Sequence, residues 1–373
     1  MDAARPIAAA PPPPPAAAKK KRPKLVDSGK YVLGPTLGRG SYGKVREGLN
    51  TQTLQVVVVK QLDKKRLRKT RGGTRKVERE VQALRRVGRS EHATELLGVV
   101  NEDSAPKAYL VLEYMPAGSL QQLLDRAPGK RLPLGQARRY FRQLVSALGY
   151  VHKKGVVHND VKPANLLLSA QHVLKLSDFG CAEFVSHFTS GDQISRSVGS
   201  PAFQSPEIAG GADDFSGSKV DVWAAGVTLY QMVTGTMPFD ADHLMELMEK
   251  IGSQDLVVPE DTPADLADLL RRILHKDETQ RIDVAEILRH EWMQVPDAPV
   301  GNADEIDLVP RVAAILSGDY LDFDFDAKDG EGAARDDSET DTESETEASE
   351  TEASASEVVE EDEELDRGRC RLQ

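Results

Sequence analysis

Cysteine is scarce in this sequence, since its 373 residues include two, Cys181 and Cys370. Two cysteines do not make the disulfide network of a small secreted domain. The apolar N-terminal stretch is broken by prolines and its basic cluster follows it, which excludes a signal peptide. We therefore expect reduced thiols in a protein of the cytoplasm and nucleus. Long apolar runs are also missing: no stretch approaches 18 consecutive apolar residues, so we expect no membrane-spanning helix.

Aromatic residues are few as well, at 5% of the chain. The most basic stretch, residues 60–89, contains none interleaved with its lysines and arginines. Base stacking on aromatic side chains is a main source of affinity for single-stranded nucleic acid. We therefore expect no specific nucleic-acid partner.

The two ends of the chain have the composition of disordered segments. Residues 1–30 are rich in Pro, Ala and basic residues and hold few large apolar side chains. Their basic cluster at 19–24 is either a nuclear localisation signal or a solvated run of charge. Residues 330–373 form an acidic tail, and the last 73 residues carry 25 acidic against 6 basic side chains. This tail either lies on the basic stretch 60–89 or is solvated independently of it.

The last four residues, Cys370-Arg371-Leu372-Gln373, have the shape of a C-a-a-X box, and the terminal Gln favours farnesyl. One prenyl chain anchors a protein only marginally, and anionic lipid repels an acidic tail. We expect farnesylation of Cys370 with weak, reversible membrane contact, which would add a membrane-associated pool to the cytoplasmic and nuclear ones.

A glycine-rich segment lies between two β-prone stretches at 31–37 and 45–49. These flanks predict a strand-loop-strand hairpin rather than the strand-to-helix turn of a dinucleotide-binding fold. Without Cβ atoms at the glycines, backbone N–H groups can approach the phosphates of ATP. The ATP-binding residues expected in and beside the loop are Leu37, Gly38, Arg39, Gly40, Ser41, Tyr42, Gly43, Lys44 and Val45.

A third strand at 55–60 ends in Lys60, a cation placed to hold the α- and β-phosphates. Its long side chain needs a carboxylate partner, and the helical stretch 76–87 offers Glu78 and Glu80. Apolar residues recur there at i, i+4 and i+7, and Glu80 borders the face that they form, whereas Glu78 lies further round. We expect Glu80 to pair with Lys60; the alternative for Glu80 is a surface partner four residues along the helix.

An apolar run at 109–115 predicts a buried strand, and the Pro-Ala-Gly that follows at 116–118 suits a hinge between two lobes. Backbone groups around Glu113 and Met115 are expected to hydrogen-bond the adenine of ATP. Leu167, in an apolar run after the next polar loop, is expected to complete the nucleotide site.

That polar loop reads His-Asn-Asp-Val-Lys-Pro-Ala-Asn and ends at Asn165, and an Asp-Phe-Gly begins at Asp178. Asp160 is placed to accept the proton of an acceptor hydroxyl, and Lys162 to steady the transferring phosphoryl group. Asn165 and Asp178 are the expected ligands of Mg2+ or Mn2+. A purely structural role does not readily explain so dense a polar set, because buried charges must be paired or bind metal.

Further along, Ser200 is expected to touch Asp160 and Lys162. All these segments, in this order, resemble a protein kinase, and Lys162 two residues after Asp160 resembles the serine/threonine class. By the same resemblance, Glu207 pairs with Arg281. Asp221 likewise braces the catalytic loop from a buried helix.

Several strings resemble the liver kinase B family, over roughly residues 31–294. They are Gly-Ser-Pro-Ala-Phe-Gln at 199–204, Pro-Glu-Ile-Ala at 206–209, Phe-Ser-Gly at 215–217, Lys-Val-Asp at 219–221 and Ala-Gly-Val-Thr-Leu-Tyr at 225–230. The resemblance implies a kinase that phosphorylates the activation loop of AMP-activated protein kinase and its relatives. It also implies activation by a pseudokinase partner and a helical-repeat scaffold.

Two positions depart from the general kinase pattern. Asn159 stands where kinases usually have Arg, the partner of an activation-loop phosphate, which favours activation by a bound protein. Val58 replaces the usual Ala before Lys60 and should narrow the adenine site and weaken ATP binding. Two alternatives therefore stay open: an ATP-binding pseudokinase scaffold, and an upstream kinase of the calcium/calmodulin-dependent kinase kinase type, although no basic amphipathic helix follows the catalytic region.

The segment pattern predicts an α+β, two-lobed kinase fold. Residues 31–115 are expected to form an antiparallel-sheet lobe interrupted by one helix, and residues 116–294 a mainly helical lobe, with ATP between them. Residues 295–329 form a flanking segment expected to pack on the kinase domain through Ile306, Leu308, Val312 and Ile315.

Overall fold

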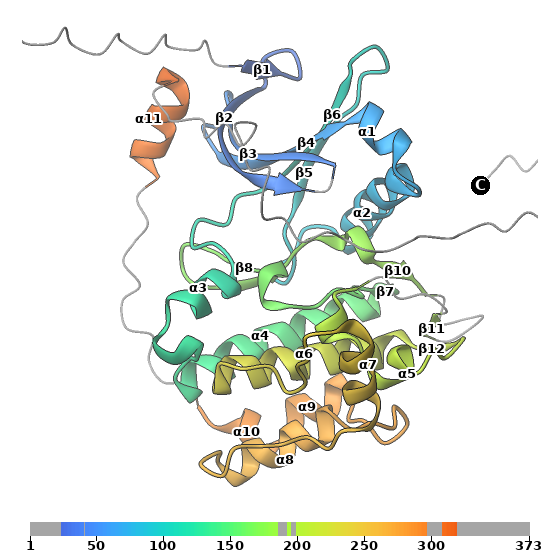
Figure 1. Cartoon of the computed structure of the whole chain (residues 1–373). Coiled ribbons are helices and arrows are strands. Elements are labelled where there is room, and N and C mark those ends of the chain that lie inside the picture. The colour runs from blue at the N-terminus through green and yellow to red at the C-terminus, as the bar shows by residue number, and fades with distance from the viewer. Residues whose placement is uncertain (1–23, 41, 186–191, 195–198, 297–307, 319–373) are drawn as a thin grey trace, which may run out of the picture. The chain divides into compact units, whose positions relative to one another are not determined.

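The computed structural model describes the kinase-like region and one helix beyond it (Figure 1). The described residues are 24–40, 42–185, 192–194, 199–296 and 308–318. Several subjects of the sequence predictions therefore lie outside the described residues: Ser41, most of the N-terminal segment, Ile306, the acidic tail and Cys370.

The small lobe is built on a six-stranded antiparallel sheet in the order β1-β2-β3-β4-β6-β5. Its strands are β1 (Lys24–Val26), β2 (Tyr31–Gly40), β3 (Gly43–Asn50), β4 (Val56–Asp63), β5 (Leu96–Val100) and β6 (Lys107–Glu113). Valine-rich β4 lies in the middle, paired with β3 and β6, because β-branched side chains suit a sheet buried on both faces. The predicted hairpin and third strand are thus present.

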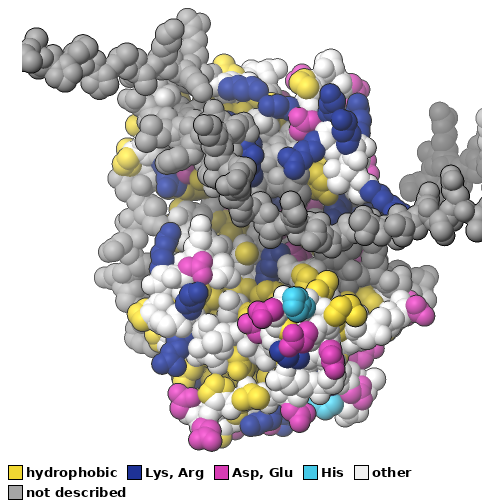
Figure 2. Space-filling view, viewed as in Figure 1, with side chains coloured by type: hydrophobic (Ala, Val, Ile, Leu, Met, Phe, Trp, Pro, Cys, Tyr) yellow, Lys and Arg dark blue, Asp and Glu magenta, His cyan; other side chains and the backbone are white. Residues whose placement is uncertain are grey.

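Two helices interrupt this sheet, where the sequence predicted one. α2 (Gly73–Val87) carries Glu80 and starts three residues before the predicted helix. α1 (Lys64–Lys69) was missed, because it is short and strongly basic and buries only Leu67. Its start is fixed by Asp63, whose side chain accepts a hydrogen bond from Arg66 N at 3.0 Å. Figure 2 shows the lysine and arginine side chains gathered over this part of the small lobe.

The large lobe is mainly helical, as predicted; most of its helices pack around one shared core, and α5 and α7 contribute to a second cluster around Trp223. They are α3 (Leu120–Arg126), α4 (Leu134–Lys153), α5 (Pro206–Ala209), α6 (Gly217–Thr234), α7 (Leu244–Ser253), α8 (Ala264–Ile273), α9 (Val284–Arg289) and α10 (Glu291–Gln294). Almost all of α6 is buried, which makes it the central helix of the lobe. No helix in the described part of the chain has both the length and the apolar character to cross a membrane.

Short strand pairs carry the polar loops of the large lobe. β7 (Val156–Val157) pairs with β10 (Glu183–Phe184), β8 (Leu166–Leu168) with β9 (Leu174–Leu176), and β11 (Gln193–Ile194) with β12 (Phe215–Ser216). The catalytic loop runs from β7 to β8, and the Asp-Phe-Gly lies between β9 and β10. These pairs therefore hold both ends of the loop that carries Asp160.

The flanking segment contributes α11 (Val309–Ser317), which packs on β2 and β3 of the small lobe (Figure 1). Ile315 is buried against Val32, Leu49 and Val56. Arg311 Nη1 lies 2.7 Å from Glu47 Oε1. Val312 joins the same cluster, and Leu308 is half-buried at the start of the helix, whereas Ile306 lies outside the described residues. The structure thus places on the small lobe a segment that the sequence could not position.

Replacing Ile315 with Ala is expected to destabilise the protein by about 2 kcal/mol, because it leaves a cavity between α11 and the sheet. The neighbouring Leu316, which is half exposed, offers a matched control: its change to Ala should leave the unfolding midpoint almost unchanged. Equilibrium unfolding in urea checks both variants. Equal midpoints for Ile315→Ala and Leu316→Ala would mean that α11 does not dock as described.

Candidate active site

The glycine-rich loop connects β2 to β3, with Gly40 opposite Gly43 in the strand pairing. A Cβ atom added to Gly43 would lie 1.8 Å from the carbonyl oxygen of Gln61 on β4. At Gly38 and Gly40 an added Cβ would meet no atom within 4 Å. Packing against β4 therefore requires glycine at position 43, and the open space beside the other two glycines is what a phosphate group could fill.

Lys60 of β4 joins two carboxylates from different parts of the chain. Its Nζ lies 2.5 Å from Glu80 Oε1 and 3.1 Å from Asp178 Oδ1, so the contact with Glu80 that the helical pattern predicted is present. Burial alone would lower the pKa of Lys60, but the two carboxylates outweigh it and raise the pKa above its ordinary value. Burial likewise works to raise the pKa of Asp178, and the charge of Lys60 lowers it below its ordinary value. Both groups are therefore charged at neutral pH.

The carboxylate of Asp160 accepts hydrogen bonds on both of its oxygens. Oδ1 accepts from the backbone N and the Oγ of Ser200, at 3.0 and 2.9 Å. Oδ2 lies 2.8 Å from Lys162 Nζ and 2.9 Å from Asn165 Nδ2. Lys162 Nζ also donates to Ser200 Oγ at 2.6 Å, so Ser200 touches both residues as expected. A hydroxyl group thus fits between the carboxylate and the ammonium.

Asp221 of α6 binds the backbone of the catalytic loop, and its side chain is fully buried. Its carboxylate accepts hydrogen bonds from the backbone N–H groups of His158 and Asn159, each at 2.8 Å. It also lies 2.8 Å from His152 Nε2. Asn159 adopts a positive φ of 62°, which Asn tolerates better than most residues. The contact predicted between Asp221 and the catalytic loop is thus confirmed. It fixes the backbone of Asn159, the residue directly before Asp160.

Asn165 and Asp178 fit a divalent cation by their donor atoms. Asn165 Nδ2 donates to the carbonyl oxygen and to Oδ2 of Asp160, which leaves its amide oxygen as a ligand. Asp178 uses Oδ1 for Lys60 and retains Oδ2. In the described part of the chain, no three His, Cys, Asp or Glu side chains form a metal cluster. A site with two protein oxygens suits Mg2+, which takes its other ligands from water and phosphate.

The hinge is anchored by Lys175 of β9, whose Nζ lies 2.9 Å from both carboxylate oxygens of Glu113. The backbone N–H of Glu113 donates to Glu95 O at 2.9 Å, so an adenine could meet this residue only through its carbonyl. Met115 is buried at the end of the same segment, and its carbonyl accepts from Gly118 N at 3.2 Å. This role of Lys175 was not predicted from the sequence, although the Leu-Lys-Leu alternation of β9 indicates a strand with Lys175 on its own face.

Leu37 and Leu167 come from opposite lobes. Leu37 is 48% exposed on β2, and Leu167 is half-buried on β8. Val58 lies on β4 opposite Leu112 of β6 and packs against the main hydrophobic core. The weakened ATP binding expected from Val58 stays a prediction.

The Asp-Phe-Gly segment points its aromatic ring into the protein. Phe179 is fully buried and meets the ring of His158 edge-on at 4.9 Å. This packing leaves Asp178 facing Lys60. Cys181, which follows the segment, has its pKa raised to about 11 by burial and by the negative charge of Asp160. It is therefore a protonated thiol rather than a reactive thiolate at neutral pH.

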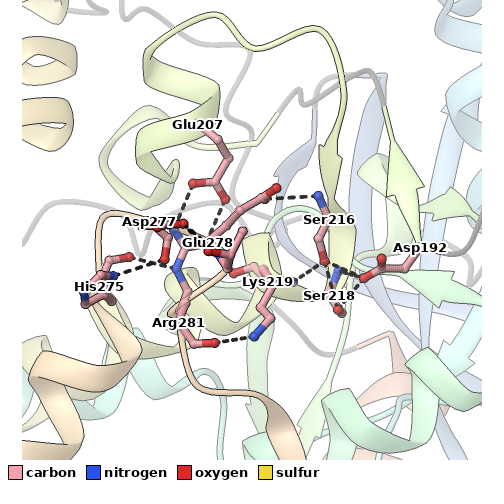
Figure 3. Close-up of polar contacts among 10 residues, drawn as sticks. Asp192, Glu207, Ser216, Ser218, Lys219, His275, Asp277, Glu278 and Arg281 are labelled. Carbon is pink, nitrogen blue, oxygen red and sulfur yellow. Dashed lines mark hydrogen bonds and ion pairs between the residues drawn. The ribbon is translucent and has the colours of Figure 1, made fainter.

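A buried ion pair holds the region after Ser200 to the base of the large lobe (Figure 3). Arg281 Nη1 and Nη2 each lie 2.8 Å from one carboxylate oxygen of Glu207. Arg281 also donates to the carbonyl oxygens of Lys219 and His275, at 3.0 and 3.1 Å. The predicted pair is thus confirmed, and it is buried and bidentate rather than a weak surface contact.

The same view shows a second contact that the sequence did not predict (Figure 3). Asp192, beyond the Asp-Phe-Gly, accepts hydrogen bonds from the hydroxyls of Ser216 and Ser218, the former at 2.5 Å. Ser216 also caps the start of α6. These bonds connect the segment after β10 to the helix that carries Asp221.

Comparison with known proteins gives the same assignment. The protein kinase domain model matches residues 31–293. Serine/threonine-protein kinase STK11 of Gallus gallus is 46% identical over 273 residues, which cover 73% of this chain and 61% of the relative. The STK11 of Homo sapiens is 45% identical over 278 residues, covering 74% and 63%. Serine/threonine-protein kinase par-4 of Caenorhabditis elegans is 39% identical over 273 residues, covering 72% and 44%.

The matched region thus spans less than two thirds of the length of these relatives. It includes every residue of the candidate active site, from the glycine-rich loop to Arg281. Because the protein kinase domain model matches more than half of the chain, the chain belongs to the protein kinase family, and its relatives over this region are serine/threonine-protein kinases.

Proposed function

We propose that this chain transfers the γ-phosphate of ATP to Ser or Thr residues on the activation loop of kinases of the AMP-activated type. Support for the reaction comes from the contact of Asp160 with Ser200 and Lys162, because it provides a carboxylate and an ammonium around one hydroxyl. Support for the substrate comes from the resemblance to the liver kinase B family and the similarity to STK11.

The proposed roles follow from the contacts at the site. Phosphoryl transfer depends mostly on positioning and on charge stabilisation, and a bound Mg2+ neutralises charge on the phosphates. Lys60, fixed by Glu80, binds the α- and β-phosphates. Asp160 orients the acceptor hydroxyl and takes its proton, and Lys162 stabilises the charge on the transferring group. Asn165 and Asp178 hold the cation through oxygen atoms.

Activation by partners is part of this proposal. A kinase that is switched by phosphorylation needs a cation beside the catalytic Asp to bind the activation-loop phosphate. This chain has the neutral Asn159 at that position. A pseudokinase partner and a helical-repeat scaffold, as the resemblance implies, would then supply the activating contacts.

The experiment is phosphate transfer from Mg2+-ATP to the catalytic domain of an AMP-activated protein kinase. Wild type and Asp178→Ala are compared with and without the pseudokinase and scaffold. We expect wild type to transfer phosphate and Asp178→Ala not to, and we expect the wild-type rate to be higher with the partners present.

Transfer by both proteins would point to a contaminating kinase. Nucleotide binding without transfer, under either condition and to a broad panel of peptides, would instead favour the pseudokinase alternative that Val58 and Asn159 raise. Transfer to the peptides but not to the AMP-activated protein kinase would support the proposed reaction and contradict the proposed substrate.

A further inference from the structure

α2 makes ionic contacts on two sides at adjacent positions. Glu80 points to the sheet and pairs with Lys60. Arg79, one residue earlier, pairs with Glu183 of β10, which belongs to the large lobe. Both side chains of this second pair are largely buried, with 25% of Arg79 and 16% of Glu183 exposed. The helix that supplies Glu80 is thus fixed to both lobes.

The position of Glu183 is fixed by a strand pair next to the catalytic loop. It lies five residues after Asp178 and pairs with Val157 in the β7–β10 ladder. Val157 directly precedes His158, the first residue of the catalytic loop. Any shift of Glu183 would therefore move the strand pair from which both the Asp-Phe-Gly and the catalytic loop extend.

A second contact ties the same face of α2 to the large lobe. Arg86 lies seven residues after Arg79, two helical turns along the same face. Its guanidinium lies 5.8 Å from the ring centre of Phe184, the residue after Glu183, and its Nε donates to Lys154 O. Two consecutive residues of β10 thus meet two arginines of α2.

Many kinases hold this helix in place with a phosphate on the activation loop, which neutralises nearby basic residues. Here the carboxylate of Glu183 already neutralises Arg79, and Asn159 supplies no cation for a phosphate. We propose that Glu183 is a positioning residue that replaces such a phosphate: it pairs with Arg79, holds α2 against the large lobe and so keeps Glu80 at Lys60. The inference rests on the proposed role of Lys60 in binding ATP phosphates.

The test is a charge swap across the pair. Arg79→Glu and Glu183→Arg each bring two like charges together, whereas the double variant restores the pair in reverse. Glu183→Gln removes the charge and keeps the shape. Arg75→Glu is the matched control, since Arg75 is exposed on the same helix and makes no ion pair within the described residues. For each protein, kcat, KM for ATP and the unfolding midpoint are measured.

We expect each charge reversal to lower kcat/KM for ATP about tenfold or more, mainly through a higher KM, because Lys60 loses its fixed position. The double variant should regain about tenfold over either single one, and Arg75→Glu should match wild type. Full activity of Glu183→Gln, a double variant no better than the worse single one, or losses confined to the unfolding midpoint would each overturn the proposal.

Hydrogen exchange of the α2 amides supplies a readout that needs no transfer activity. If wild type transfers no phosphate, the proposed function fails, and the exchange measurement still decides the inference. Faster exchange across α2 in Glu183→Arg than in Arg75→Glu supports it. Equal exchange in the two variants contradicts it.

Discussion

Replacing Asp160 with Asn is expected to lower kcat for phosphate transfer by about 10²–10⁴-fold, the usual contribution of a positioned general base. The amide has nearly the same shape, but it cannot take the proton of the acceptor hydroxyl. The amide NH2 group would also face hydrogen-bond donors in either orientation. On one side it would meet Ser200, and on the other Lys162 and Asn165. Nucleotide binding should change little, because the phosphates are assigned to Lys60 and the metal to Asn165 and Asp178.

Steady-state transfer rates and a nucleotide-binding titration check this expectation together. Asp240→Asn is the control, since Asp240 is an exposed carboxylate of the same lobe far along the chain from the loop. A variant that keeps more than a tenth of the wild-type rate would show that Asp160 does not act as the base. An equal loss of nucleotide binding would point to a general disturbance of the site instead.

The sequence predicted those parts of the site that depend on local pattern or on recognised motifs. Apolar residues at i, i+4 and i+7 selected Glu80 over Glu78, and the structure has Glu80 at 2.5 Å from Lys60. The burial of the Glu207–Arg281 pair could not be read from the sequence, although the pair itself followed from the resemblance. Burial depends on the packing of several helices around α6, which no local window describes.

The contacts that were missed join residues far apart in the chain. Arg79 and Glu183 are 104 residues apart, and neither belongs to a motif that would draw attention to it. The position of α11 depended on a complementary surface on β2 and β3, where Gly34 leaves room for Ile315. The segment of α1 shows no repeating pattern of apolar residues, because one buried leucine is enough to pack a helix of six residues. Composition and spacing do not carry such information, since it lies in the assembled fold.

Replacing Glu207 with Gln is expected to destabilise the protein by about 3 kcal/mol at neutral pH. The change leaves the guanidinium of Arg281, whose side chain is fully buried, without a charged partner. The loss should depend on pH. Burial alone would raise the pKa of Glu207, but the hydrogen bonds and charge of Arg281 outweigh it and lower the pKa below its ordinary value of 4.5.

Because the pKa is lower in the folded state, the unfolded state binds more protons on acidification, and the pair's contribution is present above pH 4.5 and lost as the pH falls below it. The difference between wild type and Glu207→Gln should therefore be largest near neutral pH and shrink in acid. Unfolding in urea from pH 7 down to pH 3 measures it, with Glu246→Gln as the control. Glu246 pairs with Lys250 on the exposed surface of α7, so its loss should leave the midpoint unchanged. A Glu207→Gln variant as stable as the control at pH 7, or a difference that stays constant in acid, would mean that the buried pair does not hold this region of the large lobe together.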